Sequence, residues 1–341
     1  MSNRLSVTVV GGGIFGLWQA LELARRGHTV TLREAAPGPG DAAASRYAGA
    51  MLAPYCEGEA AEPVVISLGL RGLELWKAAC PAVVQRGSLV VAAARDRSEL
   101  VRFARMTGGH RAVGGSEIGT LEPDLVGRFG QGLFYETEAH LAPRPALAFL
   151  AAEARRHGAE LRFGEAVTGP LWLAASDGGP VIDCRGLAAR DTLPELRGVR
   201  GEMLVVRTRD VHLTRPVRLL HPRFPLYVVP WGDDQYMVGA TVIERDDAGP
   251  VTVRSALDLL ATAYALHPAF GEAEIVEMSA GVRPAFPDNV PKVVIRGRCL
   301  YVNGAYRHGF LMAPAMAEFV ADHLETGTTH PEVFVANTAQ R

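Results

Sequence analysis

The run Gly11–Gly16, with the sequence Gly-Gly-Gly-Ile-Phe-Gly, constrains the fold of this chain more than any other feature. It satisfies the pattern G-x-G-x-x-G and lies between the apolar, β-branched run Leu5–Val10 and the helix-forming run Ile14–Arg26. Gly27 ends the helical pattern, and His28–Arg33 is typical of a second strand. Strand, glycine turn, helix and strand in this order predict a right-handed βαβ unit with two parallel, neighbouring strands.

Each glycine of this turn has a physical role in binding a dinucleotide. Gly11 permits the tight turn, Gly13 lets a diphosphate approach the backbone, and Gly16 lets the helix pack closely on the strand. The N-terminus of the helix then faces the anion, so Ile14 and Phe15 at its start join the glycines as candidate cofactor-binding residues.

An acidic residue supports this interpretation of the glycine turn. Glu34 follows the glycines by about 20 residues and ends the second strand, where a carboxylate accepts hydrogen bonds from the adenosine ribose hydroxyls. A turn that only connects strand to helix is the alternative, and the combination of strand, helix and terminal acid argues against it. The motif does not separate FAD from NAD, because both present the same diphosphate and ribose.

Beyond the βαβ unit, the sequence alternates between α/β and antiparallel patterns. The Ala-, Pro- and Gly-rich stretch 35–50 predicts an extended loop, and short strands broken by Pro, Gly and Asp predict an antiparallel sheet within residues 201–242. The expected helices are Leu68–Ala79, Ser98–Met106, Pro143–His157, Val253–Leu266 and Ala313–Leu324. The further expected strands are Gly87–Ala93, Glu160–Phe163, Pro180–Asp183, Met203–Arg207, Leu226–Val229, Gln235–Ala240 and Cys299–Asn303.

Composition and charge exclude several classes of function. With 48% hydrophobic and 21% charged residues, the 341-residue chain is composed like an ordinary globular protein, long enough for about two domains. Its net charge of −2, with both signs interspersed, argues against a nucleic-acid partner. Its apolar stretches are too short for a membrane span, and its four cysteines lack metal-ligand spacing. Because no secretory signal pattern begins the chain, we expect a cytoplasmic protein without a metal site.

Several segments match, in order and spacing, the motifs of one known family. Residues 45–54 read Ser-Arg-Tyr-Ala-Gly-Ala-Met-Leu-Ala-Pro, and residues 303–314 read Asn-Gly-Ala-Tyr-Arg-His-Gly-Phe-Leu-Met-Ala-Pro. Five shorter matches lie between them, at 143–144, 200–203, 227–230, 238–241 and 281–284. The chain thereby resembles, over nearly its whole length, the D-amino-acid oxidase family of FAD-dependent oxidoreductases. The first segment is similar to that family's second flavin-contacting segment and the last to its closing flavin motif. The glycine oxidases of thiamine biosynthesis are the most similar branch.

The resemblance implies FAD as the cofactor and a particular architecture. We expect an α/β, Rossmann-like FAD-binding domain at residues 1–80, 140–200 and 280–330. An interleaved α+β, antiparallel-sheet substrate domain is expected at residues 81–139 and 201–279. Related sarcosine oxidases attach their flavin through a cysteine near the Arg283 segment, and Ser279–Pro284 contains none, so we expect non-covalent FAD.

The resemblance also implies which residues contact the flavin. The loop entering the Ala313 helix can aim backbone N–H groups and the positive helix end at the anionic N1–C2=O edge of reduced flavin. The further cofactor-binding residues that it implies are Ser45, Arg46, Ala48, Gly49, Met51, Val167, Gly186, Gly304, Arg307, His308, Gly309, Phe310 and Leu311.

A small amino acid is the substrate that the resemblance implies. It places Arg283 as the principal clamp on the substrate carboxylate, Arg307 and Tyr227 as further contacts, and Met51 over the flavin. The alternatives are surface or ion-paired arginines, a buried structural tyrosine and a core methionine. Pro225 and Val242 stand where the glycine oxidase pattern has His and Met, which leaves the substrate range open.

The activity expected from this resemblance is oxidative deamination of a small amino acid, glycine first. The products are an imine, then a 2-oxo acid, with peroxide formed from molecular oxygen. One alternative is a D-amino-acid or sarcosine-type dehydrogenase that uses another electron acceptor, and another is a flavin-binding assembly or regulatory subunit without turnover. Formation of a homo-oligomer stays open.

Overall fold

The βαβ unit predicted from the glycine turn is present. The computed structural model describes residues 4–173, 175, 178–223 and 225–336. Strand β1 (Ser6–Val10) leads through the turn into helix α1 (Ile14–Arg25), and strand β2 (Thr29–Glu34) follows. The two strands pair in parallel, with Val10 opposite Arg33, which confirms the prediction.

The βαβ unit belongs to a seven-stranded sheet. Its five strands from β16 to β8 run parallel, and β15 pairs antiparallel with β16, so that β15 and β17 run in the opposite direction. In spatial order the strands are β17 (Phe334–Ala336), β15 (Lys292–Arg296), β16 (Cys299–Asn303), β9 (Val181–Asp183), β1, β2 and β8 (Glu160–Phe163).

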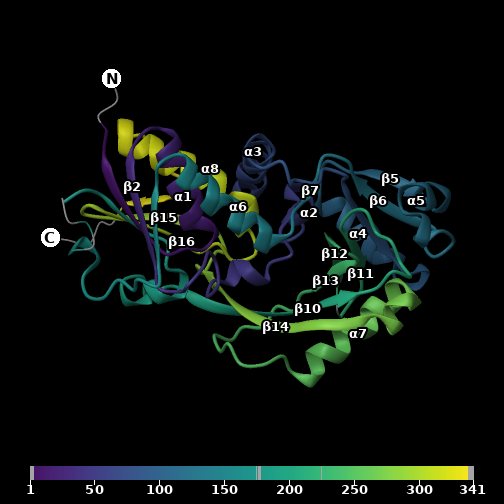
Figure 1. Cartoon of the computed structure of the whole chain (residues 1–341). Helices are drawn as coiled ribbons and strands as arrows, with labels where there is room; N and C mark the ends of the chain where they lie inside the picture. Colours follow the sequence, from purple (N-terminus) through teal and green to yellow (C-terminus); the bar gives the residue numbers. More distant parts are fainter. Residues whose placement is uncertain (1–3, 174, 176–177, 224, 337–341) are drawn as a thin grey trace.

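Four helices pack together over one face of this sheet (Figure 1). They are α1, α3 (Pro63–Ala79), α6 (Pro143–Arg156) and α8 (Gly309–Thr326). Their shared core contains the buried residues Leu17, Trp76 and Met316 together with the strand residues Val9 and Leu32. The helices therefore hold the sheet edge where β1 ends and α1 begins.

Helix α8 contains a proline that a neighbouring helix compensates. Pro314 lies inside α8 and has no N–H, so the carbonyl of Phe310 loses its intrahelical partner. The indole Nε1 of Trp76, on α3, donates a hydrogen bond to that carbonyl at 2.6 Å. A Cβ at Gly72 would lie 1.9 Å from the carbonyl oxygen of Leu311, so glycine allows α3 to approach α8 this closely. Backbone contact and the indole together fix the first turns of α8 against α3.

The second sheet has eight strands and confirms the expected antiparallel region. All its neighbours pair antiparallel except β11 and β4, which are parallel. The strands are, in spatial order, β14 (Glu274–Ala285), β10 (Arg197–Arg207), β13 (Gln235–Gly239), β12 (Leu226–Gly232), β11 (Val217–Leu220), β4 (Ser88–Ala92), β6 (Gln131–Tyr135) and β5 (Arg111–Gly114). Helix α7 (Val253–Leu266) covers β10, β12 and β13.

A long two-stranded ribbon reaches from the second sheet toward the α/β layer (Figure 1). It consists of β10 and β14, which pair from Arg197 opposite Ala285 to Arg207 opposite Glu274. Both strands run across boundaries of the domain division at 1–80, 140–200 and 280–330, which stays a proposal. The remaining elements are β3 (Met51–Leu52), paired with β7 (Ala139–His140), and the helices α2 (Pro54–Glu57), α4 (Arg97–Met106) and α5 (Gly115–Leu121).

The structure contains strands that were not expected, among them β5, β6, β11, β15 and β17, and it extends another. Strand β14 continues through Pro284 to Ala285, although a proline is typical of a chain break. Its place at the sheet edge tolerates the proline, since no ladder partner needs that N–H. Helix α8 begins at Gly309 rather than Ala313, and the expected loop 35–50 contains a short 3₁₀ turn, Ala44–Tyr47. Across the described part of the chain, no helix is long and apolar enough to cross a membrane.

We predict that Trp76→Phe lowers the free energy of unfolding by about 1–3 kcal/mol, because it leaves the buried Phe310 carbonyl without a donor. Pro314→Ala supplies a backbone N–H for that carbonyl, so Trp76→Phe should cost less in the Pro314→Ala protein. Urea unfolding of the wild-type protein, the two single variants and the double variant measures the coupling between the two substitutions. As a control, Trp231→Phe should cost less, since its indole N–H has no partner among the described residues. Strictly additive costs of the two substitutions would contradict the compensation.

Candidate functional site

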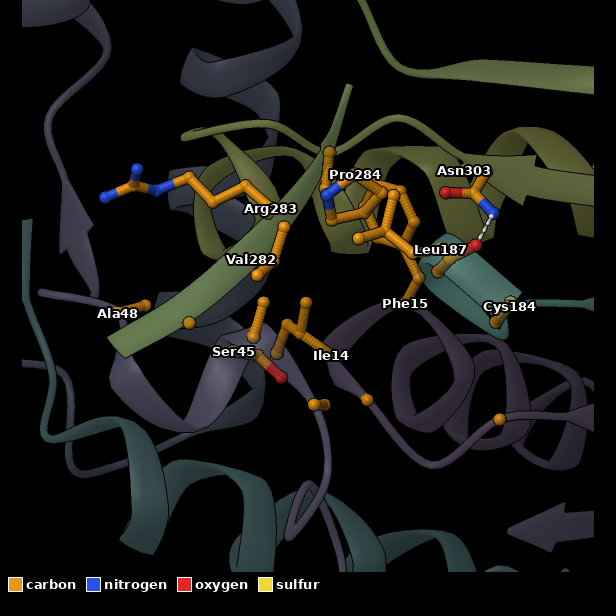
Figure 2. A pocket seen from close by; sticks show the side chains of 18 of the residues that line it. Ile14, Phe15, Ser45, Ala48, Cys184, Leu187, Val282, Arg283, Pro284 and Asn303 are labelled. Atoms are coloured by element: carbon orange, nitrogen blue, oxygen red, sulfur yellow. Dashed lines mark hydrogen bonds between the residues drawn. The ribbon is translucent and has the colours of Figure 1, made fainter. Parts of the chain in front are cut away.

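A large cavity lies where the glycine turn, residues 42–51, strand β14 and the start of α8 meet (Figure 2). Its volume is about 790 Å³, within the range of roughly 300–1,000 Å³ typical of small-molecule sites. Residues of both sheets form its wall, including Val10 of β1 and Val282 of β14. The cavity can therefore hold one long ligand that reaches from the α/β layer to the antiparallel sheet.

At two positions of the glycine turn, neighbouring backbone atoms lie so close that a residue with a side chain would not fit. Gly11 has φ +107°, and a Cβ there would lie 2.6 Å from the carbonyl oxygen of Cys184. A Cβ at Gly16 would lie 1.8 Å from the carbonyl oxygen of Gly11. Gly13 lines the cavity, where its missing side chain leaves the backbone open to a ligand.

The N-terminus of α1 presents unpaired N–H groups to the cavity. No side chain caps this end, and the first turn of α1 contains no acidic residue. Gly13, Ile14 and Phe15 line the cavity there. The first N–H groups of a helix lack intrahelical partners and carry the positive end of its dipole, so this position favours a phosphate group.

Glu34 lies beside the turn, as expected for a residue that binds a ribose. Its Oε1 accepts a hydrogen bond from the N–H of Ala36 at 2.7 Å, and its Oε2 accepts one from the N–H of Gly12. Glu34 lines the cavity, and a carboxylate has about four acceptor positions. It keeps the capacity to accept hydrogen bonds from ligand hydroxyls.

Ser45 offers an unpaired hydroxyl at the same end of the cavity. Its Oγ is buried, has no hydrogen-bond partner among the described residues, and would lie 3.7 Å from a Cβ at Gly13. A buried polar group without a partner is costly, so this hydroxyl fits a polar ligand next to the glycine turn. The neighbouring Arg46 does not line the cavity and instead pairs with Asp41 at 3.1 Å.

The loop before α8 is fixed by hydrogen bonds that hold the helix start against the cavity. Asn303 Nδ2 donates to the carbonyl of Gly186 at 2.9 Å (Figure 2), and the N–H of Gly304 donates to Asn303 Oδ1 at 2.8 Å. Gly304 has φ +78°, and a Cβ there would lie 2.2 Å from the ring of Phe286. No side chain caps α8, and residues 308–311 line the cavity. A second positive helix end therefore faces the same space.

Arg283 places a half-buried guanidinium at the other end of the cavity. Its backbone pairs with Val199 in the ribbon, its side chain extends from β14 (Figure 2), and Nη1 donates to the carbonyl of Thr241 at 3.2 Å. A Cβ at Gly201 would lie 2.0 Å from Arg283 Nη2, so only glycine lets the guanidinium lie across β10. Burial lowers the pKa of Arg283, although an arginine stays protonated. Within the described chain, no carboxylate lies within ion-pair distance of this group.

Tyr227, Arg307 and Met51 line the same cavity, so the structure brings together the four residues predicted to bind the substrate. A Cβ at Gly49 would lie 2.9 Å from the Tyr227 ring, which shows how closely the strand and the 45–54 segment approach. Tyr306, next to Arg307, also lines the cavity and has φ +46°.

Glu57 is a cavity residue that sequence reasoning missed. It ends α2, and its Oε1 lies 3.6 Å from Arg307 Nη2, while its Oε2 lies 3.4 Å from His308 Nδ1. Burial opposes ionisation, but Arg307 and His308 lower the pKa of Glu57 to about 2. The one sequence signal that could have indicated Glu57 is its position, three residues after the segment 45–54 that matches the family. Burial lowers the pKa of His308 to about 4 despite Glu57, so this imidazole is neutral at neutral pH.

Most of the predicted site residues meet at this cavity. Gly16, Arg46 and Gly304 do not line it; Gly16 and Gly304 act through backbone packing. The predicted residues that line it are Gly11, Gly13, Ile14, Phe15, Glu34, Ser45, Ala48, Gly49, Met51, Val167, Gly186, Tyr227, Arg283, Arg307, His308, Gly309, Phe310 and Leu311. Their individual roles stay predictions.

The donor set fits FAD. The uncapped end of α1 and the orphaned Ser45 hydroxyl suit the diphosphate end of a dinucleotide, and Glu34 suits its ribose. The uncapped end of α8 suits an electron-rich ring edge. A metal ion has no comparable site, because no group of three or more His, Cys, Asp or Glu residues in the described ranges could hold one.

Comparison with known proteins gives a consistent picture. The family model described as "DAO: FAD dependent oxidoreductase" matches residues 6–323. The chain is 53% identical over 329 residues to a Rhizobium etli protein named as a thiamine biosynthesis oxidoreductase, ThiO, covering 96% of this chain and 99% of the relative. It is 26% identical to a Geobacillus kaustophilus glycine oxidase, covering 96% and 95%. The crystal structure of glycine oxidase from Geobacillus kaustophilus matches with a TM-score of 0.79 at 23% identity, covering 98% of this chain and 99% of that one. The last match confirms the expected fold class.

We predict that Gly11→Ala yields protein without bound flavin. A methyl group there would collide with the Cys184 carbonyl and strain a backbone at φ +107°, so the turn must shift away from its binding geometry. The measurement is visible flavin absorbance relative to protein absorbance after purification. Gly108→Ala, with no atom within 4 Å of the added Cβ, should keep its flavin. Full flavin content in Gly11→Ala would disprove the role of this glycine.

Proposed function

The chain belongs to the family of FAD-dependent oxidoreductases, and on this premise we propose that it oxidises glycine within thiamine biosynthesis. Glycine would lose a hydride from Cα and a proton from nitrogen to give the imine, which water hydrolyses to the 2-oxo acid and ammonia. The observation that carries the proposal is the half-buried guanidinium of Arg283, which has no ion-pair partner among the described residues. It lies in the cavity that the two uncapped helix ends also face.

Arg283 is the group that would bind the substrate carboxylate. A guanidinium forms two parallel hydrogen bonds with a carboxylate, and burial strengthens them because water does not compete. Its position on a paired strand, with the side chain laid against Gly201, leaves little freedom to move. The carboxylate would therefore be held in one orientation.

The neighbouring cavity residues would complete the substrate site. Tyr227 carries a hydroxyl that can donate to the same carboxylate, and Met51 supplies an apolar surface beside it. Substrate position would dominate the rate, since a fixed geometry removes much of the entropy cost of reaction. When bound, FAD supplies the redox chemistry by accepting the hydride.

No protein base is needed in this scheme. With pKa values of about 2 and about 4, Glu57 and His308 are both weak proton acceptors. The amino acid would therefore enter or become reactive as the neutral amine after losing its proton to solvent.

We also propose that FAD is bound non-covalently, that oxygen is the acceptor, and that the protein works in the cytoplasm. Of the four cysteines, Cys184 alone lines the cavity, and it lies beside Gly11 at the turn rather than near Arg283. All four cysteines are free and buried, which suits a reducing compartment. We propose further that the protein can form a homo-oligomer, and measurement of its mass in solution tests this.

Anaerobic mixing with glycine, sarcosine and D-alanine tests the proposed function. We expect glycine to bleach the flavin absorbance fastest, and air to restore it with one peroxide formed per turnover. Bleaching without peroxide under air would instead support the dehydrogenase alternative. If none of the three amines bleaches the flavin, the proposed function is wrong and a non-catalytic flavin-binding role is favoured.

We predict that Arg283→Ala and Gly201→Ala share one phenotype. Loss of the guanidinium, or its displacement by the new Cβ, should raise the apparent KM for glycine by about 100-fold or more while flavin content stays unchanged. Steady-state kinetics of purified holoenzyme provide the measurement, with Gly108→Ala as the matched control. An unchanged KM in Arg283→Ala would rule out the carboxylate clamp.

A further inference from the structure

Two half-buried arginines, Arg283 and Arg307, line the substrate end of the cavity, and their electrostatic surroundings differ. Arg307 lies 3.6 Å from a carboxylate oxygen of Glu57. Arg283 makes its hydrogen bond to a neutral carbonyl, that of Thr241. Glu57 Oε1 also lies 3.9 Å from Nη2 of Arg218, a residue that does not line the cavity. Of the two arginines in the cavity, Arg307 thus has a carboxylate partner, whereas Arg283 has none among the described residues. Arg283 is therefore the arginine that is open to a ligand carboxylate.

From this geometry we infer that Glu57 is a specificity-determining residue, which occupies Arg307 and thereby restricts the site to substrates with one carboxylate. The inference rests on the proposed function and deepens it. A substrate with a second anionic group would need a second cationic side chain, but the other arginine of the cavity, Arg307, is already paired with Glu57. Such a substrate would also bring its charge close to Glu57, whose carboxylate would repel it.

Glu57 is held in place from behind, which supports a fixed role. Glu57 is the last residue of the short helix α2, and its side chain is 12% exposed. The preceding residue, Cys56, donates its N–H to Glu138 Oε1 at 2.8 Å and accepts from Arg218 Nη1 at 3.2 Å through its carbonyl. Glu138 is fully buried. These contacts hold the backbone that carries Glu57, and the Glu57 carboxylate itself lies near Arg307, His308 and Arg218.

The charge of Glu57 is firmly maintained. Although burial opposes ionisation, the positive charge of Arg307 above all, with His308 and Arg218 beside it, lowers the pKa of Glu57 to about 2. At any pH at which the protein is handled, Glu57 therefore stays a carboxylate. An amide of the same shape would keep the packing and remove the charge.

The test compares binding of a monocarboxylate with that of a dicarboxylate to purified holoenzyme, without turnover. Acetate and malonate are titrated into the wild-type protein, Glu57→Gln and the control Glu62→Gln, and each Kd is read from the change in flavin absorbance. Glu62 is exposed at the start of α3, so its substitution removes the same charge outside the cavity. We expect Glu57→Gln to shift the ratio of acetate Kd to malonate Kd by about tenfold or more in favour of malonate, the size of one charge-assisted hydrogen bond. Glu62→Gln should leave the ratio unchanged.

A double variant tests whether the gained preference for malonate comes from Arg307. In the double variant Glu57→Gln, Arg307→Gln the preference gained for malonate should disappear. Loss of glycine binding in Glu57→Gln with an unchanged ratio of the two Kd values would overturn the inference, because Glu57 would then serve the substrate amine. A ratio unchanged in every variant would overturn it too. Since no turnover is measured, a failure of glycine oxidation in the wild-type protein remains distinguishable from a failure of this inference.

Discussion

Contact between backbones at the glycine turn is the constraint on which the cofactor cavity depends. Gly16 lies against the carbonyl of Gly11, and Gly11 in turn lies against the carbonyl of Cys184, so β1, α1 and the end of β9 meet without side chains between them. This approach aims the uncapped end of α1 into the cavity. The effect of a helix end on an anion falls off within its first turn, so a shift of the turn by the width of one methyl group would weaken that interaction.

The second helix end reaches the cavity by a different route. Pro314 removes a hydrogen bond near the start of α8, at the place where the helix must be most precisely positioned. The Trp76 indole replaces the missing donor, and it does so from α3, a helix that also packs on the α/β core. The replacement hydrogen bond therefore joins α8 to α3, whereas the lost bond would have lain within α8. This contact helps to position the N–H groups of Gly309 and Phe310 at the start of α8.

The sequence could predict those features that depend on local pattern. The βαβ unit followed from hydrophobic periodicity and the glycines, and the helices α4, α6 and α7 followed from periodicity with clear ends. The continuation of strand β14 through Pro284 could not be predicted, because the proline is tolerated only at a sheet edge, and only the pairing of the strands reveals that edge. The same limit hid the roles of Gly201 and Glu57. Gly201 matters because Arg283 crosses it from the partner strand, and Glu57 because α2 brings it to Arg307. Arg46 lies in a matching segment but pairs with Asp41 outside the cavity, so its predicted contact with the cofactor stays a prediction.

Charge compensation at the substrate end links stability to selectivity. Two half-buried guanidinium groups near one another repel, and each loses part of its hydration, so the site without a ligand carries a cost in folding free energy. Glu57 offsets that cost at Arg307 and leaves it in place at Arg283, the position that a bound carboxylate would neutralise. Had both arginines been paired, the cavity would bind carboxylates weakly; had neither been paired, it would admit two anionic groups and be harder to fold. One paired and one unpaired arginine in the cavity is the arrangement that would favour binding of a single carboxylate, at Arg283.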